Sequence, residues 1–297
     1  MDILPERADV RIVHISFFVA AAAYLLLIIP FTTHLKNRPL QLKVGYVPEA
    51  KVLKFISADQ RYLVADWVVL KVLFYFGSLV EKAEGENLVA SNPDYPGMFK
   101  MLQTGLKLEP YNADAYYFAQ AAFTWEVGRY KEVNNLLDYG MKYRTWDAKL
   151  PFFAGFNSAY FMKDYKKAAE YMKKAAEISG YQQFATLASR YFYEAGDTEF
   201  GILFINMMKG SAKDANEKKL YEFRLKALLA VKSIENATML YQRAFGKVPA
   251  NLAELVSAGF LTTVPQDPYG GKFFIDQDGK VRSTSKLSFA GTKAASK

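Results

Sequence analysis

Three short turn sequences recur at a nearly constant interval in the middle of the chain. They are GRY at 128–130, KDY at 163–165 and GDT at 196–198, so they lie 35 and 33 residues apart. Each turn lies between two stretches in which an apolar residue returns every three or four positions, the pattern of an amphipathic helix. A helix, a turn and a second helix repeated in this way predict a stack of helical hairpins, each burying its apolar stripe against the next.

The residues around these turns resemble the tetratricopeptide repeat family, over about residues 100–230. The matches are small or aromatic side chains at the positions where paired helices of that family pack together. In the first unit they are Tyr117, Ala121, Gly128, Tyr130, Leu137 and Gly140. In the second and third units they are Phe152, Gly155, Tyr165, Ala168, Met172, Ala175, Ala185, Ser189, Gly196, Ile205 and Met208. The resemblance implies an all-α solenoid of helical hairpins, which we expect over residues 58–231.

The resemblance also implies a concave groove lined by the first helix of each pair. Counting along those helices places nine side chains in the groove, most of them aromatic: Phe118, Ala122, Trp125, Phe152, Phe156, Tyr160, Arg190, Tyr193 and Glu194. Such a lining suits an apolar peptide or a partner helix. The alternative is that these rings pack against a helix of the same chain, such as residues 62–80, because aromatic side chains usually belong to a core.

An uncharged apolar stretch occupies residues 12–35, near the N-terminus. Its 24 residues extend about 36 Å as a helix, enough to cross the roughly 30 Å hydrocarbon core of a bilayer. The alternative is a cleaved signal peptide, but the Ala20–Ala23 run that resembles a cleavage site is followed by further apolar residues. We therefore expect a retained transmembrane helix after a short N-terminal flank, residues 1–11.

Positive charges flank this stretch on both sides. Two arginines precede it and three cations follow it within residues 36–43, so the positive-inside rule gives no clear orientation. The basic linker, residues 36–57, suits an anionic lipid surface, where each cation gains about 1 kcal/mol. The alternative is a linker that its charges simply keep solvated.

A second apolar stretch, residues 62–80, contains Asp66 and Lys71 near its middle. Two charges at that depth in a bilayer would be costly. We therefore expect a buried or membrane-apposed helix here instead of a second span.

The pattern changes in residues 232–283. Pro249 and Gly259 suit the start and the left-handed end of a short helix. Residues 273–275 and 280–283 are expected to form two short strands, and Asp278-Gly279 supplies the tight turn between them. The sequence therefore predicts a small module that consists of a helix and a β-hairpin, followed by a disordered tail over residues 284–297.

This module resembles the C-terminal part of the G-type pseudopilins of type II secretion and of their type IV pilin relatives. The matching residues are Pro249, Leu252, Leu255, Gly259, Pro265, Asp267, Pro268, Tyr269, Gly270 and Gly271. Residues 1–18 lack the prepilin-peptidase site of that family, and its acidic calcium-binding loop is also missing. We therefore expect a module that docks on or imitates a pilin, or that caps the array. The extracytoplasmic location of pilins favours the periplasmic face of a bacterial inner membrane.

The composition excludes several kinds of chemistry. The chain has no cysteine and only two histidines, His14 and His34, which lie in the first apolar stretch. Disulfides, thiolate metal sites and Ser-His-Asp triads are thereby excluded. The acidic residues alternate with lysines along helices, as on solvated helix faces, which argues against an enzyme that uses carboxylates alone. The aspartates at 267, 276 and 278 lack the alternating oxygens of a calcium-binding loop. We predict no enzyme activity, no cofactor and no metal.

The basic net charge of +8 comes with no nucleic-acid-binding motif, so we expect protein partners and a membrane, and no nucleic acid. The sequence predicts a membrane-anchored scaffold that recruits or assembles proteins of a bacterial envelope complex, such as a secretion system or pilus. The alternative is a stoichiometric accessory subunit, in which residues 12–35 and 62–80 pack against a partner's membrane helices and the array is a structural cap.

Overall fold

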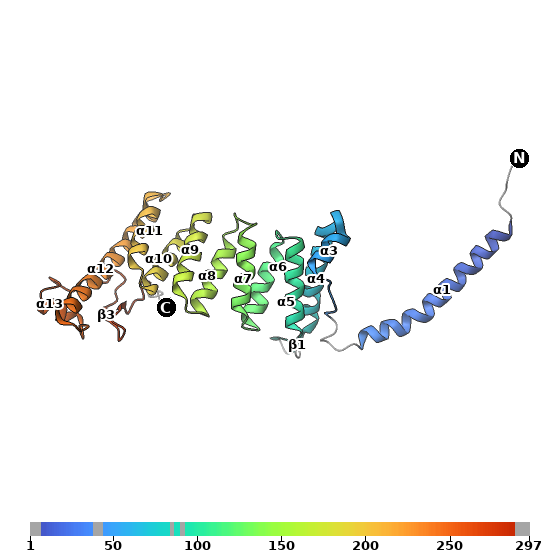
Figure 1. The fold of residues 1–297 in the computed structure, drawn as a ribbon, viewed down its shortest axis with the longest axis horizontal. Helices are drawn as coiled ribbons and strands as arrows, with labels where there is room; N and C mark the ends of the chain where they lie inside the picture. The colour runs from blue at the N-terminus through green and yellow to red at the C-terminus, as the bar shows by residue number, and fades with distance from the viewer. Residues whose placement is uncertain (1–6, 38–43, 84–85, 90–92, 289–297) are drawn as a thin grey trace, which may run out of the picture. The chain divides into compact units, whose positions relative to one another are not determined.

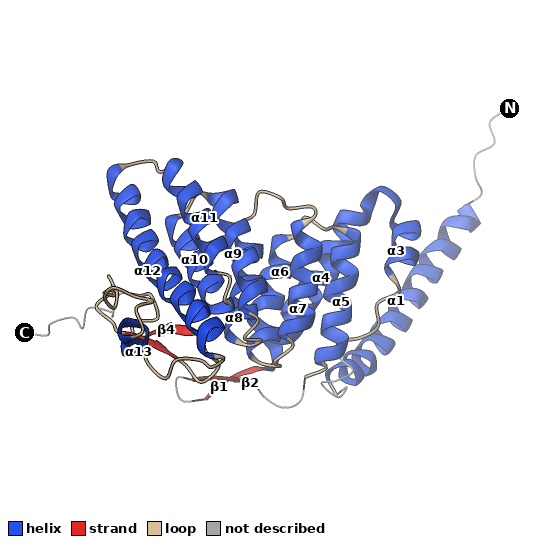
Figure 2. Cartoon of the chain, turned by 60° about the vertical axis from the view of Figure 1, so that its left-hand side comes forward, coloured by secondary structure: helices blue, strands red, loops and turns tan. Residues whose placement is uncertain are grey.

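The computed structural model describes residues 7–37, 44–83, 86–89 and 93–288. It confirms a mostly helical chain with a long apolar helix near the N-terminus and a small β-hairpin near the C-terminus (Figures 1 and 2). The chain forms two compact units, residues 1–109 and 110–297. Each unit is described by itself below.

Unit 1 opens with α1 (Arg7–Lys36), a helix of 30 residues that is about 45 Å long at 1.5 Å per residue. Among the described residues, two stretches are long and apolar enough to cross a membrane, Ile12–Lys36 and Ala50–Leu79. No part of the first is buried, whereas a third of the second is buried. The first is therefore a candidate single-pass anchor.

The rest of unit 1 is a small helical assembly. Its elements are α3 (Ala50–Ser57), the 3-10 turn η1 (Ala58–Gln60), α4 (Arg61–Leu79), the strands β1 (Val80–Ala83) and β2 (Glu86–Val89), and α5 (Tyr95–Leu108). Helix α4 packs against α5. Gly105 allows the close approach, since a Cβ there would lie 3.0 Å from the Val69 side chain. The Asp94 carboxylate accepts from the Gly97 N–H and begins α5.

The β1–β2 pair was not predicted from the sequence. The two strands are antiparallel, with Val80 opposite Val89 and Ala83 opposite Glu86. Each strand has only four residues, which is too short for an alternating pattern to stand out beside the helical periodicity on either side.

Unit 2 is a succession of helices followed by the small module. Its helices are α6 (Ala113–Phe118), the π-helix η2 (Ala119–Phe123), α7 (Tyr130–Met141), α8 (Lys149–Tyr160), α9 (Tyr165–Ser179), α10 (Gln182–Ala195), α11 (Thr198–Gly210) and α12 (Ala215–Phe245). Each helix from α7 to α12 packs against the next one along the chain. Small residues lie at these contacts: a Cβ on Gly155 would be 3.3 Å from the Ala168 carbonyl, and one on Gly201 would be 3.2 Å from the Ser189 carbonyl.

The module after α12 comprises α13 (Leu252–Ser257) and the antiparallel hairpin of β3 (Phe273–Ile275) and β4 (Val281–Ser283). The Asn251 side chain accepts from the Glu254 N–H and begins α13. The expected module boundary at residue 232 falls inside α12, which continues to Phe245 without a break. The module shares one apolar core with α9 to α12, since Leu255 and Val281 lie in the same buried cluster as Leu228.

The three recurrent turns share one backbone feature. Gly128, Lys163 and Gly196, the first residues of GRY, KDY and GDT, have φ values of +69°, +54° and +85°. This left-handed conformation is easy for glycine and costs other residues about 1–2 kcal/mol. Lys163 therefore adopts a strained left-handed conformation, whereas glycine occupies the equivalent position in the other two turns.

Replacing these turn residues should change stability in opposite directions. We expect Gly196→Ala to lower the free energy of unfolding by about 1 kcal/mol through backbone strain alone, because an added Cβ there meets no atom within 4 Å. Lys163→Gly should raise it by about 0.5 kcal/mol, less than the strain relieved because glycine gains unfolded-state entropy. Urea unfolding followed by circular dichroism measures both changes. Equal effects of the two substitutions would contradict a common left-handed turn.

Candidate functional site

Five aromatic side chains form one cluster on unit 2: Trp125, Tyr130, Phe156, Tyr160 and Phe161. We call them the aromatic cluster. The Trp125 ring centroid lies 5.9 Å from Phe156, 6.0 Å from Tyr160 and 5.1 Å from Phe161. Phe156 stacks on Tyr160 at 5.4 Å, and Tyr130 stacks on Phe161 at 5.3 Å. Such ring pairs stabilise a rigid arrangement beyond the burial of their area.

The aromatic cluster is open to solvent. Trp125 and Tyr160 are each 55% exposed, although they are held by their neighbours. The Lys163 ammonium lies 5.4 Å from the Tyr160 ring centroid, which places a cation at the edge of the cluster. A rigid, exposed group of large aromatic rings with a cation beside it is typical of a protein-binding hot spot.

A buried polar network holds the helices beneath the cluster. The Asn157 side-chain amide donates to Oε1 of Gln120 at 2.8 Å and to Oδ1 of Asn134 at 2.9 Å. The Asn134 amide in turn donates to the Ala154 carbonyl and to the Ser158 hydroxyl. These residues lie on η2, α7 and α8, so the network joins three helices near the cluster: Tyr160 ends α8, and Trp125 follows the end of η2 by two residues.

The predicted groove residues are not all brought together. Trp125, Phe156 and Tyr160 meet in the aromatic cluster. Phe152 is half-buried and lies 5.1 Å from Phe184, and the Phe118 ring lies 6.1 Å from Phe123, which is buried.

Ala122 is only 4% exposed, so it does not line an open groove. It lies inside the π-helix η2, whose wider turn shifts the face on which the following residues lie. Counting along a regular helix, as in the sequence-based expectation, takes no account of this wider turn. Tyr130 and Phe161 were not among the expected groove residues, because these two rings lie outside the first helices of the pairs.

Tyr193 and Glu194 contact the chain's own hairpin. Tyr193 is buried, and its hydroxyl accepts a hydrogen bond from the Ser283 N–H at 3.0 Å. Burial, with a contribution from Glu194, raises the pKa of Tyr193 to about 12. The Arg282 guanidinium pairs with Glu194 at 2.8 Å and with Asp276 at 3.1 Å. This end of the expected groove is therefore filled by the protein itself.

Arg190 lies at a smaller pocket of about 230 Å³ together with Arg224. The Nε atoms of both arginines are buried and have no hydrogen-bond partner within the described part of the chain. Arg224 donates through Nη1 to the Leu287 carbonyl at 2.6 Å and lies over the Tyr269 ring. Burial lowers the pKa of Arg224, and the charge of Arg190 lowers it further.

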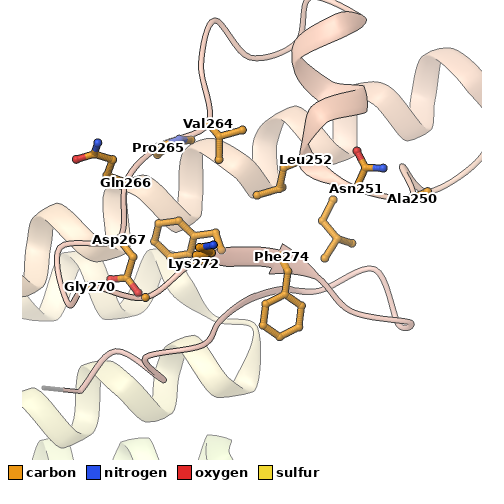
Figure 3. Close-up of a pocket in the computed structure, with 13 residues that line it drawn as sticks. Ala250, Asn251, Leu252, Val264, Pro265, Gln266, Asp267, Gly270, Lys272 and Phe274 are labelled. Carbon is orange, nitrogen blue, oxygen red and sulfur yellow. The ribbon is translucent and has the colours of Figure 1, made fainter. Parts of the chain in front are cut away.

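A cleft of about 640 Å³ lies in the C-terminal module (Figure 3). It is bounded by α13, the loop that follows it and β3, with Leu252 and Val264 on one side of β3 and Phe274 on the other. The Asp267 carboxylate accepts from the hydroxyls of Ser283 and Ser285, so it stabilises the loop. Among the described residues, no group of three or more His, Asp or Glu side chains could hold a metal ion.

No protein-family model matches the chain, and no curated protein matches its sequence. The assignment of a function therefore depends on the residues and contacts described above.

The buried network should be essential for the stability of unit 2. We expect Asn157→Ala to lower the free energy of unfolding by about 2–4 kcal/mol, because Gln120 and Asn134 would each lose a partner while remaining buried. The matched control is Asn135→Ala, a change at an exposed position that should alter stability by less than about 0.5 kcal/mol. Chemical unfolding of the full chain in detergent measures both. Equal losses would show that the network contributes nothing specific.

Proposed function

We propose that this protein is a membrane-anchored scaffold of a bacterial envelope complex, which binds a peptide or helix of a partner protein on its aromatic cluster. The observation that carries this proposal is the cluster itself. Trp125 and Tyr160 present large apolar rings to solvent in a fixed geometry, and their burial by a partner would supply binding energy without much loss of side-chain freedom.

We further propose that α6 to α12 form a tetratricopeptide-like array. Three features support this: the packing of each helix from α7 to α12 on the next, the left-handed residue in each recurrent turn, and the glycines where helices approach closely. In such an array the helices act as a rigid support for a binding face. This role requires no catalytic residue and no cofactor.

The anchor in this proposal is α1, and we place the soluble part on the periplasmic side of the inner membrane. The resemblance of the C-terminal module to pilin-like proteins supports that side and favours secretion or pilus components as partners. The salt bridge of Arg282 to Glu194 and the hydrogen bond from the Ser283 N–H to the Tyr193 hydroxyl join the module to α10 and support a module that caps the last helices.

A second candidate function is a stoichiometric accessory subunit of a membrane complex. The observation in its favour is the exposure of apolar side chains on α4, including Trp67 at 59% and Phe74 at 74%, which would also suit contact with the membrane helices of a partner. In that case the aromatic cluster would not determine binding.

Removing the exposed rings should abolish partner capture. We expect the Trp125→Ala, Tyr160→Ala double variant to bind the partner at least about 30-fold more weakly, since a hot-spot residue contributes about 2 kcal/mol or more. The measurement is cross-linking of the tagged full chain in its native membrane, followed by detergent extraction, affinity capture and quantitative mass spectrometry. Circular dichroism shows that the helices remain folded.

The matched control is Trp146→Ala with Tyr143→Ala, a second exposed tryptophan and tyrosine on the same unit. Proteins that are lost only from the Trp125, Tyr160 variant are partners of the cluster. If the unsubstituted chain, the Trp125, Tyr160 variant and the control variant all recover the same set of membrane subunits, the scaffold proposal is contradicted and the accessory subunit is favoured.

A further inference from the structure

Helix α4 is apolar on two opposite faces, and the described part of unit 1 covers only one of them. Leu63, Trp67, Leu70 and Phe74 are 66%, 59%, 47% and 74% exposed. Their spacing of three or four residues places them in one stripe along the helix. The opposite face, which includes Val68 and other buried residues, belongs to the side that packs against α5.

Helix α3 carries a second stripe of the same kind. Val52, Phe55 and Ile56 are 47%, 89% and 71% exposed, and the same spacing places them on one face. Helix α3 packs against α4 and is joined to it by the three residues of η1. We call the two stripes together the α3–α4 face. Seven large apolar side chains exposed over so short a segment mark a surface that something else covers.

The chain itself limits how far this face can lie from the bilayer. Lys36 ends α1, the candidate anchor, and residues 37–43 are all that separates it from Val44. The eight Cα–Cα steps from Lys36 to Val44 span at most about 28 Å when fully extended, at about 3.5 Å per step. A surface tethered so closely to a membrane is at high effective concentration beside it.

Charge and residue type both suit a lipid surface. Residues 36–79 carry seven lysines and arginines against three carboxylates. Lys51 and Lys54 are exposed on α3, and the Lys71 ammonium lies 5.2 Å from the Trp67 ring centroid. Cations beside a membrane meet anionic phosphates, and tryptophan prefers the interface between headgroups and hydrocarbon.

Insertion across the hydrocarbon core is less favourable for α4 than contact with the surface. Asp66 and Lys71 lie beside the exposed stripe. The opposite side is packed on α5, where Lys100 and Lys107 are exposed. A spanning α4 would therefore place several charges in lipid or lose its contacts with α5.

We propose that the α3–α4 face lies on the phospholipid bilayer in which α1 is anchored. Its aromatic and aliphatic side chains enter the headgroup region, and its lysines face anionic phosphates. The bilayer thereby holds unit 1 at the membrane surface through two contacts, one spanning and one interfacial. This inference rests on the part of the proposed function that makes α1 an anchor, and it is independent of the aromatic cluster.

The absence of cysteine from the chain allows a direct test by single-cysteine spin labelling. The full chain carrying Phe74→Cys is reconstituted in liposomes of phosphatidylglycerol and phosphatidylcholine. Collision of the label with oxygen, which partitions into lipid, is compared with collision with a water-soluble nickel chelate. The matched control is Phe200→Cys on α11, a phenylalanine that is 62% exposed in unit 2.

We expect the ratio of oxygen to nickel accessibility to be several-fold higher at Phe74→Cys than at Phe200→Cys. The ratio at Phe74→Cys should correspond to a label depth in the headgroup region. Water-like accessibility at both positions would overturn the proposal. A label that neither reagent reaches would overturn it in favour of a second copy of the chain. A depth at the bilayer centre would overturn it in favour of a spanning α4.

A second variant separates the face from the anchor. Trp67→Glu changes an exposed position and should leave the circular dichroism of the chain unchanged. Combined with the Phe74→Cys label, it should reduce the oxygen-to-nickel ratio toward the value of the control. Alkaline extraction of the same liposomes tests α1 separately. Release of the unsubstituted protein would overturn the anchor and with it this proposal. The affinity capture with the Trp125, Tyr160 variant tests the aromatic cluster independently of this result.

Discussion

Each helix of this protein has an apolar face that must leave water, and the chain supplies a cover for only some of these faces. In unit 2 the next helix along the chain provides the cover, and the C-terminal module packs against α12 and contacts the end of α10. Apolar burial is the dominant favourable contribution to folding, so this successive packing is the main stabilising interaction of unit 2. Helix α1 and one face of α4 receive no such cover within the described residues, and the same requirement is the reason why we propose that both contact a bilayer.

Polar interactions determine how the covered helices are arranged. The hydrogen bonds among Gln120, Asn134 and Asn157 join η2, α7 and α8 in one geometry, because any other arrangement would leave buried amides without partners. The short left-handed turns then reverse the chain within a few residues. Together they position the aromatic cluster on a rigid support, which is what a binding surface for a peptide or helix requires.

Local signals in the sequence predicted the helical class, the apolar N-terminal helix and the C-terminal hairpin. The N-terminal helix could be predicted because its run of uncharged residues is visible in the sequence. The hairpin could be predicted because Asp278-Gly279 marks a tight turn, in which Gly279 has a φ of +75°. The expected boundary at residue 232 falls inside α12, which continues to Phe245, because a change in composition does not end a helix. The π-helix at Ala119–Phe123 leaves no pattern in the sequence, so the position of Ala122 could not be predicted.

Long-range contacts limited the prediction of the site further. Arg282 pairs with Glu194 across 88 residues of chain, and no periodicity records such a pair. Three of the nine expected groove residues, Trp125, Phe156 and Tyr160, do meet, because helical spacing within α8 and the turn at Gly128 are local features. Tyr130 and Phe161 join them through tertiary packing, which the sequence alone does not reveal.

Hydroxyl-radical footprinting of the full chain tests the central claim most directly, because it reports the solvent exposure of individual aromatic side chains. It should be applied both in native membranes and to the purified protein in lipid nanodiscs. Our account predicts that Trp67 and Phe74 are protected in both, since lipid covers them, whereas Trp125 and Tyr160 are protected only in native membranes, where the partner is present. Strong modification of Trp67 in nanodiscs, or protection of Trp125 without a partner, would contradict it.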